Sequence, residues 1–394
     1  MRIAVDTLFE HPDCFTGALD YLRNVAGTFP KLAPNHEYFL LVSNRNLKHF
    51  REFKVPNVHF VQCYRSNENM PLRILIQQTL VPLKLSRLKI DVLFAPGNVC
   101  AFWGDFCKVL KINTLHQYHR PELVGRARSV YRKFFFEESA RRATHILANT
   151  LSTKAEICKF MNIPEQKVTV TGEAFYDIYT TVSDDQINRA TASHGIHSDY
   201  VLFVSSLYSY KNVDTLIKAF AHLVNKPPLR TDIDLVIVGR DYDSILPNLQ
   251  ALACELGISE RVRFLGFVPT EDIPALYSGA KVFVFPSLIE TFGKPLVEAM
   301  RCGVPIVASN ASCIPEVVSD AALLVNPLNA VEMSAAIARV VDNHVLRTHL
   351  IARGLDRAKN FSWETGARDT LAVIERSFEE WKRAHIQPAL VQGA

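Results

Sequence analysis

The chain has 394 residues, of which 48% are hydrophobic, 21% charged and 10% aromatic, which excludes a chain that is disordered as a whole. Its 44 basic and 40 acidic residues leave a net charge of +4, so it lacks the basic excess typical of nucleic-acid-binding proteins, and we expect no nucleic-acid partner. Because a single core rarely grows beyond about 250–300 residues, we expect two domains.

The first half of the chain alternates short apolar runs with segments long enough to form helices. The runs predict strands at Arg2–Asp6, Glu37–Val42, Asn57–Gln62, Asp91–Ala95, Lys108–Asn113 and Thr144–Ala148. Because these runs are almost continuously apolar, we expect a parallel, doubly wound α/β sheet with helices on both faces. This sheet would form an N-terminal domain over residues 1–175.

The same alternation returns in the second half. It predicts strands at Tyr200–Ser205, Asp234–Gly239, Arg261–Gly266, Lys281–Phe285, Pro305–Ser309 and Ala322–Val325. These strands would build a second doubly wound, Rossmann-like domain over residues 176–365. Residues 176–197 are polar with little apolar periodicity, which indicates an interdomain segment. Since ligands of open α/β sheets bind outside the carboxyl ends of the strands, we expect the two domains to face a cleft.

The strongest candidate for a site follows the predicted strand Lys281–Phe285. Pro295 suits the first position of a helix, and Gly303 suits the end of that helix. Residues 291–295 would therefore present free backbone N–H groups at a helix start, where anions bind, and Gly293 would permit the close approach of a ligand.

Two carboxylates, Glu290 and Glu298, flank this predicted anion site. An ionised carboxylate accepts strong hydrogen bonds from ribose or sugar hydroxyls, so the pair indicates a nucleotide sugar as the ligand. Alternatively, Glu290 is a solvated loop residue and Glu298 an ordinary charge near a helix N-terminus.

This motif resembles the second domain of the family-4 retaining glycosyltransferases, which have the GT-B fold. The likeness continues through Ala-Met-x-Cys-Gly-x-Pro-Ile-Val-Ala-Ser and residues 314–327. Other segments agree over most of the chain, at residues 114–117, 204–212, 262–266 and 361–364. The resemblance implies two Rossmann-like domains that face a cleft, with a C-terminal helix at residues 366–394 packing back on the first domain.

The resemblance also assigns roles in donor binding. It implies that Glu298 holds the ribose hydroxyls and that Glu290 contacts the transferred sugar. The backbone amides of Phe292, Gly293 and Lys294 would border the sugar and the diphosphate.

Lys211 and Val268 complete the donor site that the resemblance implies: the lysine neutralises the diphosphate, and the backbone at Val268 meets the nucleotide base. After a strand, a lysine can stabilise a departing diphosphate, although an ordinary surface lysine is the alternative. The family usually has an arginine a few residues earlier, where this chain has Ser206 and Tyr210. Either Arg240 replaces that arginine, or the diphosphate binds more weakly.

The first domain supplies two further residues. Gly17 resembles part of the family's small-residue loop that approaches the donor and acceptor. Alternatively, it is only a glycine at the start of a helix. His116 matches the family histidine near the donor sugar, and Gln117 stands where an aspartate commonly follows. The predicted catalytic residues are therefore Glu290, His116 and Lys211.

Neither a metal ion nor a cofactor other than the donor is expected. Asp241 and Asp243 resemble a metal-binding Asp-x-Asp, but the GT-B resemblance implies no bound metal, and two carboxylates rarely suffice to hold a cation. The chain has no Gly-x-Gly, which excludes the dinucleotide-binding fingerprint.

The cysteine pattern and the N-terminal sequence indicate the cellular compartment of the protein. The eight cysteines are scattered without a Cys-x2-Cys pair, which favours a reducing compartment. The N-terminus lacks the apolar region of a signal peptide, and no run of 18 apolar residues occurs, so we expect a cytoplasmic protein. The basic and aromatic segment 126–136 could contact the inner membrane peripherally, or it could be a core-packing helix with a solvated basic face.

The leading hypothesis is a retaining, metal-independent hexosyltransferase. It would move mannose or glucose from a GDP- or UDP-linked donor to a glycan or lipid-linked acceptor in envelope polysaccharide or lipopolysaccharide biosynthesis. Two alternatives remain: a non-catalytic binding or regulatory subunit of GT-B fold, which the missing arginine favours, and a sugar-nucleotide epimerase.

Overall fold

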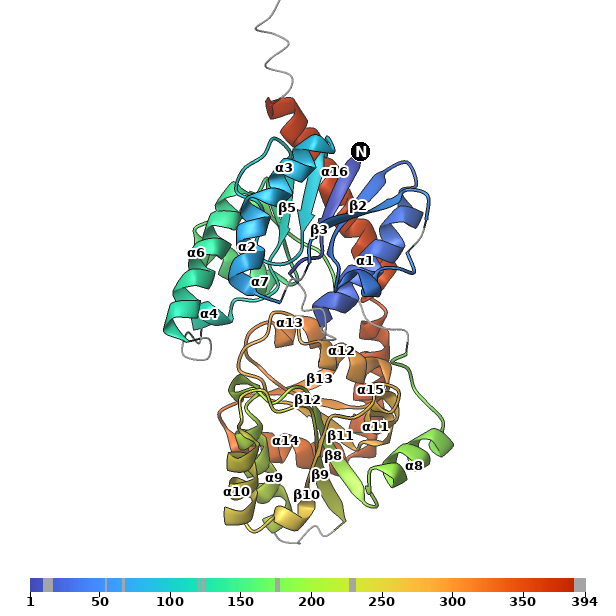
Figure 1. Ribbon diagram of the computed structural model, residues 1–394. Coiled ribbons are helices and arrows are strands. Elements are labelled where there is room, and N and C mark those ends of the chain that lie inside the picture. Colours follow the sequence, from blue (N-terminus) through green and yellow to red (C-terminus); the bar gives the residue numbers. More distant parts are fainter. Residues whose placement is uncertain are drawn as a thin grey trace, which may run out of the picture. The chain divides into compact units, whose positions relative to one another are not determined.

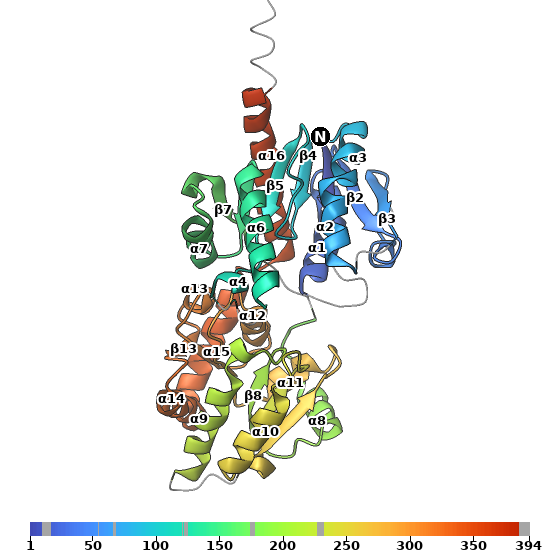
Figure 2. The same cartoon turned by 60° about the vertical axis from the view of Figure 1, so that its left-hand side comes forward.

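The computed structural model describes residues 1–9, 17–53, 55–65, 68–119, 121, 125–173, 178–226 and 232–385. The chain divides into two compact units, Met1–Ala174 with Ser362–Ala394, and Phe175–Phe361. Each unit is built on one parallel sheet covered by helices (Figures 1 and 2). The predicted fold class, two parallel-sheet α/β domains, is confirmed.

The first unit contains a seven-stranded sheet in the order β3-β2-β1-β4-β5-β6-β7, with every neighbouring pair parallel. Its strands are β1 (Arg2–Asp6), β2 (Glu37–Ser43), β3 (Val58–Tyr64), β4 (Val92–Ala95), β5 (Cys107–Lys111), β6 (His145–Ala148) and β7 (Val168–Val170). The apolar side chains of the central strands are buried because helices cover both faces of the sheet, whereas most of those on the edge strand β3 are half-buried. The strand order changes direction between β1 and β4.

The helices of the first unit form two layers. One core joins the sheet to α1 (Gly17–Leu32) and α16 (Trp363–His385), and the core on the opposite face includes α2, α3, α6 and α7. These helices and the short α4 span Met70–Gln78 (α2), Leu80–Arg87 (α3), His116–His119 (α4), Arg126–Arg142 (α6) and Leu151–Met161 (α7). The C-terminal helix α16 thus starts slightly earlier than residues 366–394 would suggest and packs on the first unit, and residues 386–394 lie outside the described part.

The second unit contains a six-stranded parallel sheet in the order β10-β9-β8-β11-β12-β13. Its strands are β8 (Asp199–Val204), β9 (Ile233–Val238), β10 (Val262–Gly266), β11 (Val282–Phe285), β12 (Ile306–Ser309) and β13 (Ala322–Val325). Here the strand order changes direction between β8 and β11.

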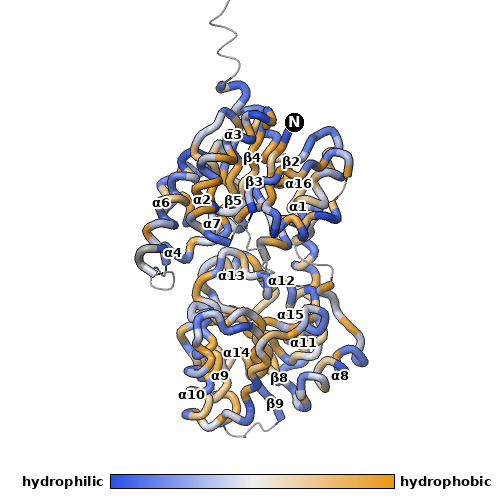
Figure 3. The backbone as a smooth tube through the Cα atoms, in the orientation of Figure 1, coloured by the Kyte–Doolittle hydropathy of each residue, from blue (hydrophilic) through white to orange (hydrophobic). Residues whose placement is uncertain are grey.

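Two helical layers cover this second sheet as well. The helices α9, α10 and α14 share one core with it, and α11, α12 and α13 share the other. The helices of this unit are α8 (Asp184–Ser193), α9 (Val213–Asn225), α10 (Leu246–Glu255), α11 (Ile273–Gly279), α12 (Lys294–Arg301), α13 (Ile314–Val318), α14 (Ala330–Asp342) and α15 (His344–Ala358). In both units hydrophobic residues concentrate along the strands, while hydrophilic residues recur along the helices (Figure 3).

Two elements were not expected from the sequence. Strand β7 has only three residues, too few to show a periodic pattern. Helix α8 lies inside the predicted interdomain segment, of which residues 176 and 177 are outside the described part. A capping box between Ser183 and Gln186 starts this helix, and it packs on α11 with Ala190 buried. The segment therefore includes a helix that packs within the second unit.

The described part of the chain has no helix that is both long and apolar enough to pass through a lipid bilayer. The seven cysteines that the structure describes are all free thiols.

Candidate functional site

The candidate site of the second unit lies where the strand order reverses. Strands β8 and β11 are neighbours there, and the chain leaves both at the same edge of the sheet because they are parallel. The loop after β8 carries Lys211, and the loop after β11 carries Glu290. Ligands of open α/β sheets bind at this kind of position.

Lys211 and Glu290 form a nearly buried ion pair. The Lys211 Nζ atom donates to Glu290 Oε1 at 2.6 Å, and the two side chains are only 8% and 11% exposed. The ammonium also lies 5.2 Å from the ring centres of both Tyr210 and Phe285. An ammonium has three N–H donors, so the pair holds the cation in place and leaves two donors for an anion.

The backbone of Glu290 is fixed by the residues just before α13. Its N–H donates to Ser312 Oγ at 3.2 Å, and the Ser312 hydroxyl donates to the Glu290 carbonyl at 2.6 Å. The Cys313 thiol donates to the same carbonyl at 3.3 Å. The sequence did not predict a role for Ser312. The residues around it give no sign that its hydroxyl forms a hydrogen bond with a loop 22 residues away.

Asn212 fixes the loop that carries Lys211. It adopts a left-handed backbone with φ of 60°, and its side-chain amide donates to the carbonyls of Pro286 at 3.1 Å and Pro327 at 2.7 Å. The loops after β8, β11 and β13 are thereby joined. In addition, the Leu288 N–H donates to the carbonyl of Tyr210 at 2.9 Å.

The start of α12 has the backbone geometry of the predicted anion site. Gly293 is the N-cap with φ of 84°, a left-handed conformation that favours glycine, and Lys294 begins the helix. A Cβ atom on Gly293 would lie 3.0 Å from Leu296. The Phe292 ring is buried against Phe361, so this residue can offer a ligand only its backbone.

Glu298 lies on α12 and is oriented by a buried tyrosine. The Tyr277 hydroxyl donates to Glu298 Oε2 at 3.1 Å. Burial, reinforced by the negative charge of Glu298, raises the pKa of Tyr277, so the hydroxyl remains a donor at neutral pH. Sequence reasoning also missed Tyr277. Val268 follows β10 and is buried in the core, so its side chain does not face a ligand.

An aromatic stack occupies the region where the family's arginine was expected. The ring of Tyr208 stacks on Tyr210 and on Tyr242, with ring centres 5.4 Å apart in each pair. Burial and the charge of Glu290 raise the pKa of Tyr210. The Arg240 guanidinium lies 4.4 Å from the centre of the Phe267 ring. Its replacement of the missing arginine stays a prediction.

The two aspartates that resemble a metal motif bind backbone N–H groups instead. Asp241 accepts from Ile245 and Leu246 at 3.0 and 2.9 Å, at the start of α10. Asp243 accepts from the Ser209 N–H at 3.0 Å. Across the described ranges, no group of three or more His, Cys, Asp or Glu residues could hold a metal ion.

The remaining predicted residues belong to the first unit. Gly17 is the first residue of α1, and Thr16 before it lies outside the described part. His116 begins α4, just after β5, and is half-buried. The neighbouring Gln117 is wholly buried, and its side-chain amide makes no hydrogen bond in the described structure. The structure thus brings Lys211 and Glu290 into direct contact in the second unit.

Comparisons with known proteins agree along most of the chain. Residues 16–172 match the family model described as Glycosyltransferase Family 4, and residues 186–357 match that of Glycosyl transferases group 1. The O-antigen chain mannosyltransferase B of Escherichia coli is 32% identical over 264 residues, covering 66% of this chain and 67% of that protein. A D-inositol 3-phosphate glycosyltransferase of Corynebacterium aurimucosum is 30% identical over 243 residues, covering 60% and 58%.

Solved structures show the same fold. Sucrose-phosphate synthase of Thermosynechococcus elongatus superposes with a TM-score of 0.76 at 17% identity, covering 96% of this chain and all of that one. HepE of Anabaena, solved with UDP and glucose, gives a TM-score of 0.73 at 20% identity over 95% of this chain. With both family models matched and the two parallel-sheet domains in place, the chain belongs to the group 1 glycosyltransferases of GT-B fold, the family that its sequence resembles.

Proposed function

We propose that the chain is a retaining hexosyltransferase that uses a GDP- or UDP-linked donor, with mannose or glucose as the transferred sugar. Its acceptor would be a glycan or a lipid-linked sugar in envelope polysaccharide synthesis. The observation that carries this proposal is the buried Lys211–Glu290 pair at the strand reversal of the second sheet. The name of the Escherichia coli relative, an O-antigen chain mannosyltransferase, supports the sugar and the pathway.

In the proposed reaction, the bond between the anomeric carbon and the diphosphate oxygen breaks while the acceptor oxygen attacks on the same face. The acceptor proton passes to the leaving phosphate oxygen, so the step requires no metal ion and no enzymic nucleophile. Lys211 and the amides at the start of α12 stabilise the charge that develops on the diphosphate. Glu290 holds Lys211 and accepts a hydrogen bond from the sugar, and Glu298 binds the ribose hydroxyls.

The first test is calorimetric binding of UDP, GDP and ADP to the parent chain and to Glu298→Ala. We expect one nucleotide to bind selectively, and the variant to bind it more weakly by about 1.5–3 kcal/mol, the value of a hydrogen bond to a charged group. Equal affinity in the variant would contradict the ribose role of Glu298. Absence of binding by every nucleotide would instead favour a non-catalytic subunit.

The second test is sugar transfer itself. Incubation with the selected donor should transfer sugar only when an acceptor is present, and a chelator should leave the rate unchanged. Isomerisation of the donor sugar without an acceptor would identify an epimerase. Loss of transfer in the presence of the chelator would contradict the metal-independent mechanism. It would make Asp241 and Asp243 candidate metal ligands.

We also propose a peripheral contact with the cytoplasmic face of the inner membrane through the first unit. On α6, Val130 and Phe134 lie one turn apart and are 70% and 56% exposed, beside the exposed Arg128. On α2, Leu72 and Leu75 are 47% and 58% exposed. Apolar side chains next to basic ones suit an anionic bilayer. Phe134→Glu should reduce sedimentation with phosphatidylglycerol vesicles, and unchanged sedimentation would contradict this contact.

A further inference from the structure

The ammonium of Lys211 lies over two aromatic rings in addition to its ion pair with Glu290. Its Nζ atom is 5.2 Å from the ring centre of Tyr210 and 5.2 Å from that of Phe285. Tyr210 follows β8 and Phe285 is the last residue of β11, so each strand of the reversal supplies one ring. A cation within about 6 Å of a ring centre is attracted by the negative charge on the ring face.

The rings attract this ammonium without adding a net negative charge to the site. The single hydrogen bond to Glu290 does not fix the ammonium by itself, because the four-carbon stem of a lysine is flexible. A second carboxylate would hold the ammonium more firmly, but it would also repel an incoming diphosphate. Aromatic rings restrict the ammonium and leave its other N–H groups to an anion. This arrangement suits a cation whose position matters as well as its charge.

The Tyr210 ring is fixed in turn by its neighbours at the carboxyl edge of the sheet. It stacks on Tyr208 with ring planes 12° apart, and Tyr208 stacks on Tyr242 of the loop after β9 with planes 10° apart. The Tyr242 N–H donates to the Leu207 carbonyl at 3.3 Å, which joins the loops after β8 and β9. The Leu288 N–H donates to the Tyr210 carbonyl at 2.9 Å and joins the loop after β11. Tyr210 therefore lies where loops from three strands meet.

The Phe285 ring links the ammonium to the start of α12. Phe285 is wholly buried, and a Cβ atom on Gly293 would lie 3.5 Å from its ring. Gly293 is the N-cap of α12, the end at which a helix binds anions. One ring thus lies beside both the ammonium of Lys211 and this helix start, so the two positive groups are neighbours.

We propose that Tyr210 is a positioning residue, whose ring holds the Lys211 ammonium in the orientation in which it binds the donor diphosphate. The binding of the diphosphate by Lys211 rests on the proposed function, whereas the hold of the ring on the ammonium does not. In this role Tyr210 acts through Lys211 and does not itself bind the donor. The tyrosine hydroxyl is not needed, because the attraction comes from the ring face.

Calorimetric titration with UDP and with GDP tests this role through a double-mutant cycle. For the nucleotide that the parent chain binds, Tyr210→Leu should weaken the affinity by about tenfold, whereas Tyr210→Phe should keep it within about twofold. In a Lys211→Ala background, Tyr210→Leu should have no further effect, because the ring then has no cation to hold. An equal loss of affinity in both backgrounds would overturn the proposal.

A measurement without nucleotide separates this inference from the proposed function. A ring face shields nuclei above it, so the protons of the methylene group next to Nζ of Lys211 should resonate upfield of those of the exposed Lys218. Tyr210→Leu should move this resonance downfield and Tyr210→Phe should leave it in place, with Lys211→Ala identifying the signal. An unchanged resonance in Tyr210→Leu would overturn the proposal. The expected shift, together with unchanged nucleotide affinity in Lys211→Ala, would contradict only the role that the proposed function gives to Lys211.

A third measurement keeps the shape of the ring, so it does not depend on the folding of the leucine variant. Phenylalanines with increasing numbers of fluorine atoms, incorporated at position 210, have a progressively weaker negative face and a similar size. Nucleotide affinity should fall stepwise along this series, whereas equal affinities would overturn the proposal.

Phe160→Leu is the matched control for Tyr210→Leu. The Phe160 ring on α7 of the first unit also has a lysine ammonium over it, that of Lys159 at 5.8 Å. Phe160→Leu should leave nucleotide affinity unchanged. A loss as large as that in Tyr210→Leu would show that the effect is not specific to the ring beside Lys211, which would overturn the proposal.

Discussion

Lys211 and Glu290 are charges that the protein keeps almost out of water, at 8% and 11% exposure. Removing one partner of a buried pair leaves the other charge uncompensated, which costs about 3–5 kcal/mol. We therefore expect Lys211→Ala to lower the free energy of unfolding by about 3 kcal/mol, measured by urea denaturation. It should also reduce sugar transfer by about a hundredfold or more if Lys211 is the proposed cation at the leaving group.

The matched control for Lys211 is an exposed pair. Lys218 lies 3.4 Å from Asp214 on α9, and both side chains are about half exposed. Because an exposed pair contributes less than about 1 kcal/mol, Lys218→Ala should change stability little. Similar losses in the two variants would show that the burial of the Lys211 pair has no energetic consequence.

Single residues of the site could be predicted when their role depends on local sequence. Lys211 and Glu290 each follow a recognisable strand, and Gly293 with Pro295 marks a helix start. By contrast, Tyr277 and Ser312 act through side chains that form hydrogen bonds with groups on other elements. Contacts of that kind depend on the packing of elements far apart in the chain, which no local pattern records.

At the scale of elements, α16 is tied to the first unit by a glycine. A Cβ atom on Gly366 would lie 2.8 Å from the backbone carbonyl oxygen of Gly172. Alanine is usually favoured over glycine in a helix by about 1 kcal/mol, but this carbonyl cannot move away as a flexible side chain would. We expect Gly366→Ala to destabilise the chain by about 1–3 kcal/mol in thermal unfolding, as overpacking does.

Gly354 on α15 provides the contrast. A Cβ atom there would come no closer than 3.3 Å to an atom of Met300, whose flexible side chain can adjust. Gly354→Ala should therefore be neutral or slightly stabilising. If both glycine variants gained stability equally, the close approach of α16 to Gly172 would not constrain that helix.

The elements themselves were largely predictable. Twelve of the strands follow from runs of apolar residues, because a strand buried on both faces needs such a run. The three-residue strand β7 was not predicted in this way. It is a strand because it pairs with β6, and its own composition does not indicate one. Helix α8 was also not predicted, because its residues are mostly exposed and polar. Its packing on α11 therefore produces only a weak hydrophobic pattern in the sequence.

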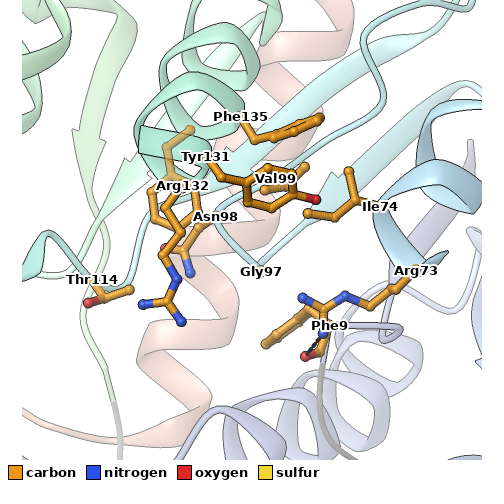
Figure 4. Close-up of a pocket in the computed structure, with 11 residues that line it drawn as sticks. Phe9, Arg73, Ile74, Gly97, Asn98, Val99, Thr114, Tyr131, Arg132 and Phe135 are labelled. Carbon is orange, nitrogen blue, oxygen red and sulfur yellow. Dashed lines mark hydrogen bonds between the residues drawn. The ribbon is translucent and has the colours of Figure 1, made fainter. Parts of the chain in front are cut away.

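At the scale of the whole molecule, the two units have similar sheets but carry different charged residues where the strand order reverses. Each sheet reverses its strand order once, and each reversal carries a cation: Lys211 with its glutamate in the second unit, and two arginines in the first. The paired cation suits a site whose charge must be held in one orientation. Arg73 and Arg132 line a pocket of the first unit (Figure 4), and neither forms an ion pair within the described residues.

The two units should also respond differently to acid, because the first contains a buried histidine. Burial, with the charges of Arg376, Lys167 and Lys154, lowers the pKa of His145 to about 4 from the ordinary 6.5. Between these values the unfolded chain binds a proton that the folded chain does not, so the stability present above pH 6.5 is lost as the pH falls towards 4. The loss amounts to about 2 kcal/mol at pH 5.

Urea denaturation of the parent chain at pH 7 and pH 5 should show this loss of stability. The loss should be smaller in His145→Gln and unchanged in His349→Gln, which alters an exposed histidine of the second unit. Equal pH dependence in the parent and His145→Gln would mean that another group accounts for the acid sensitivity.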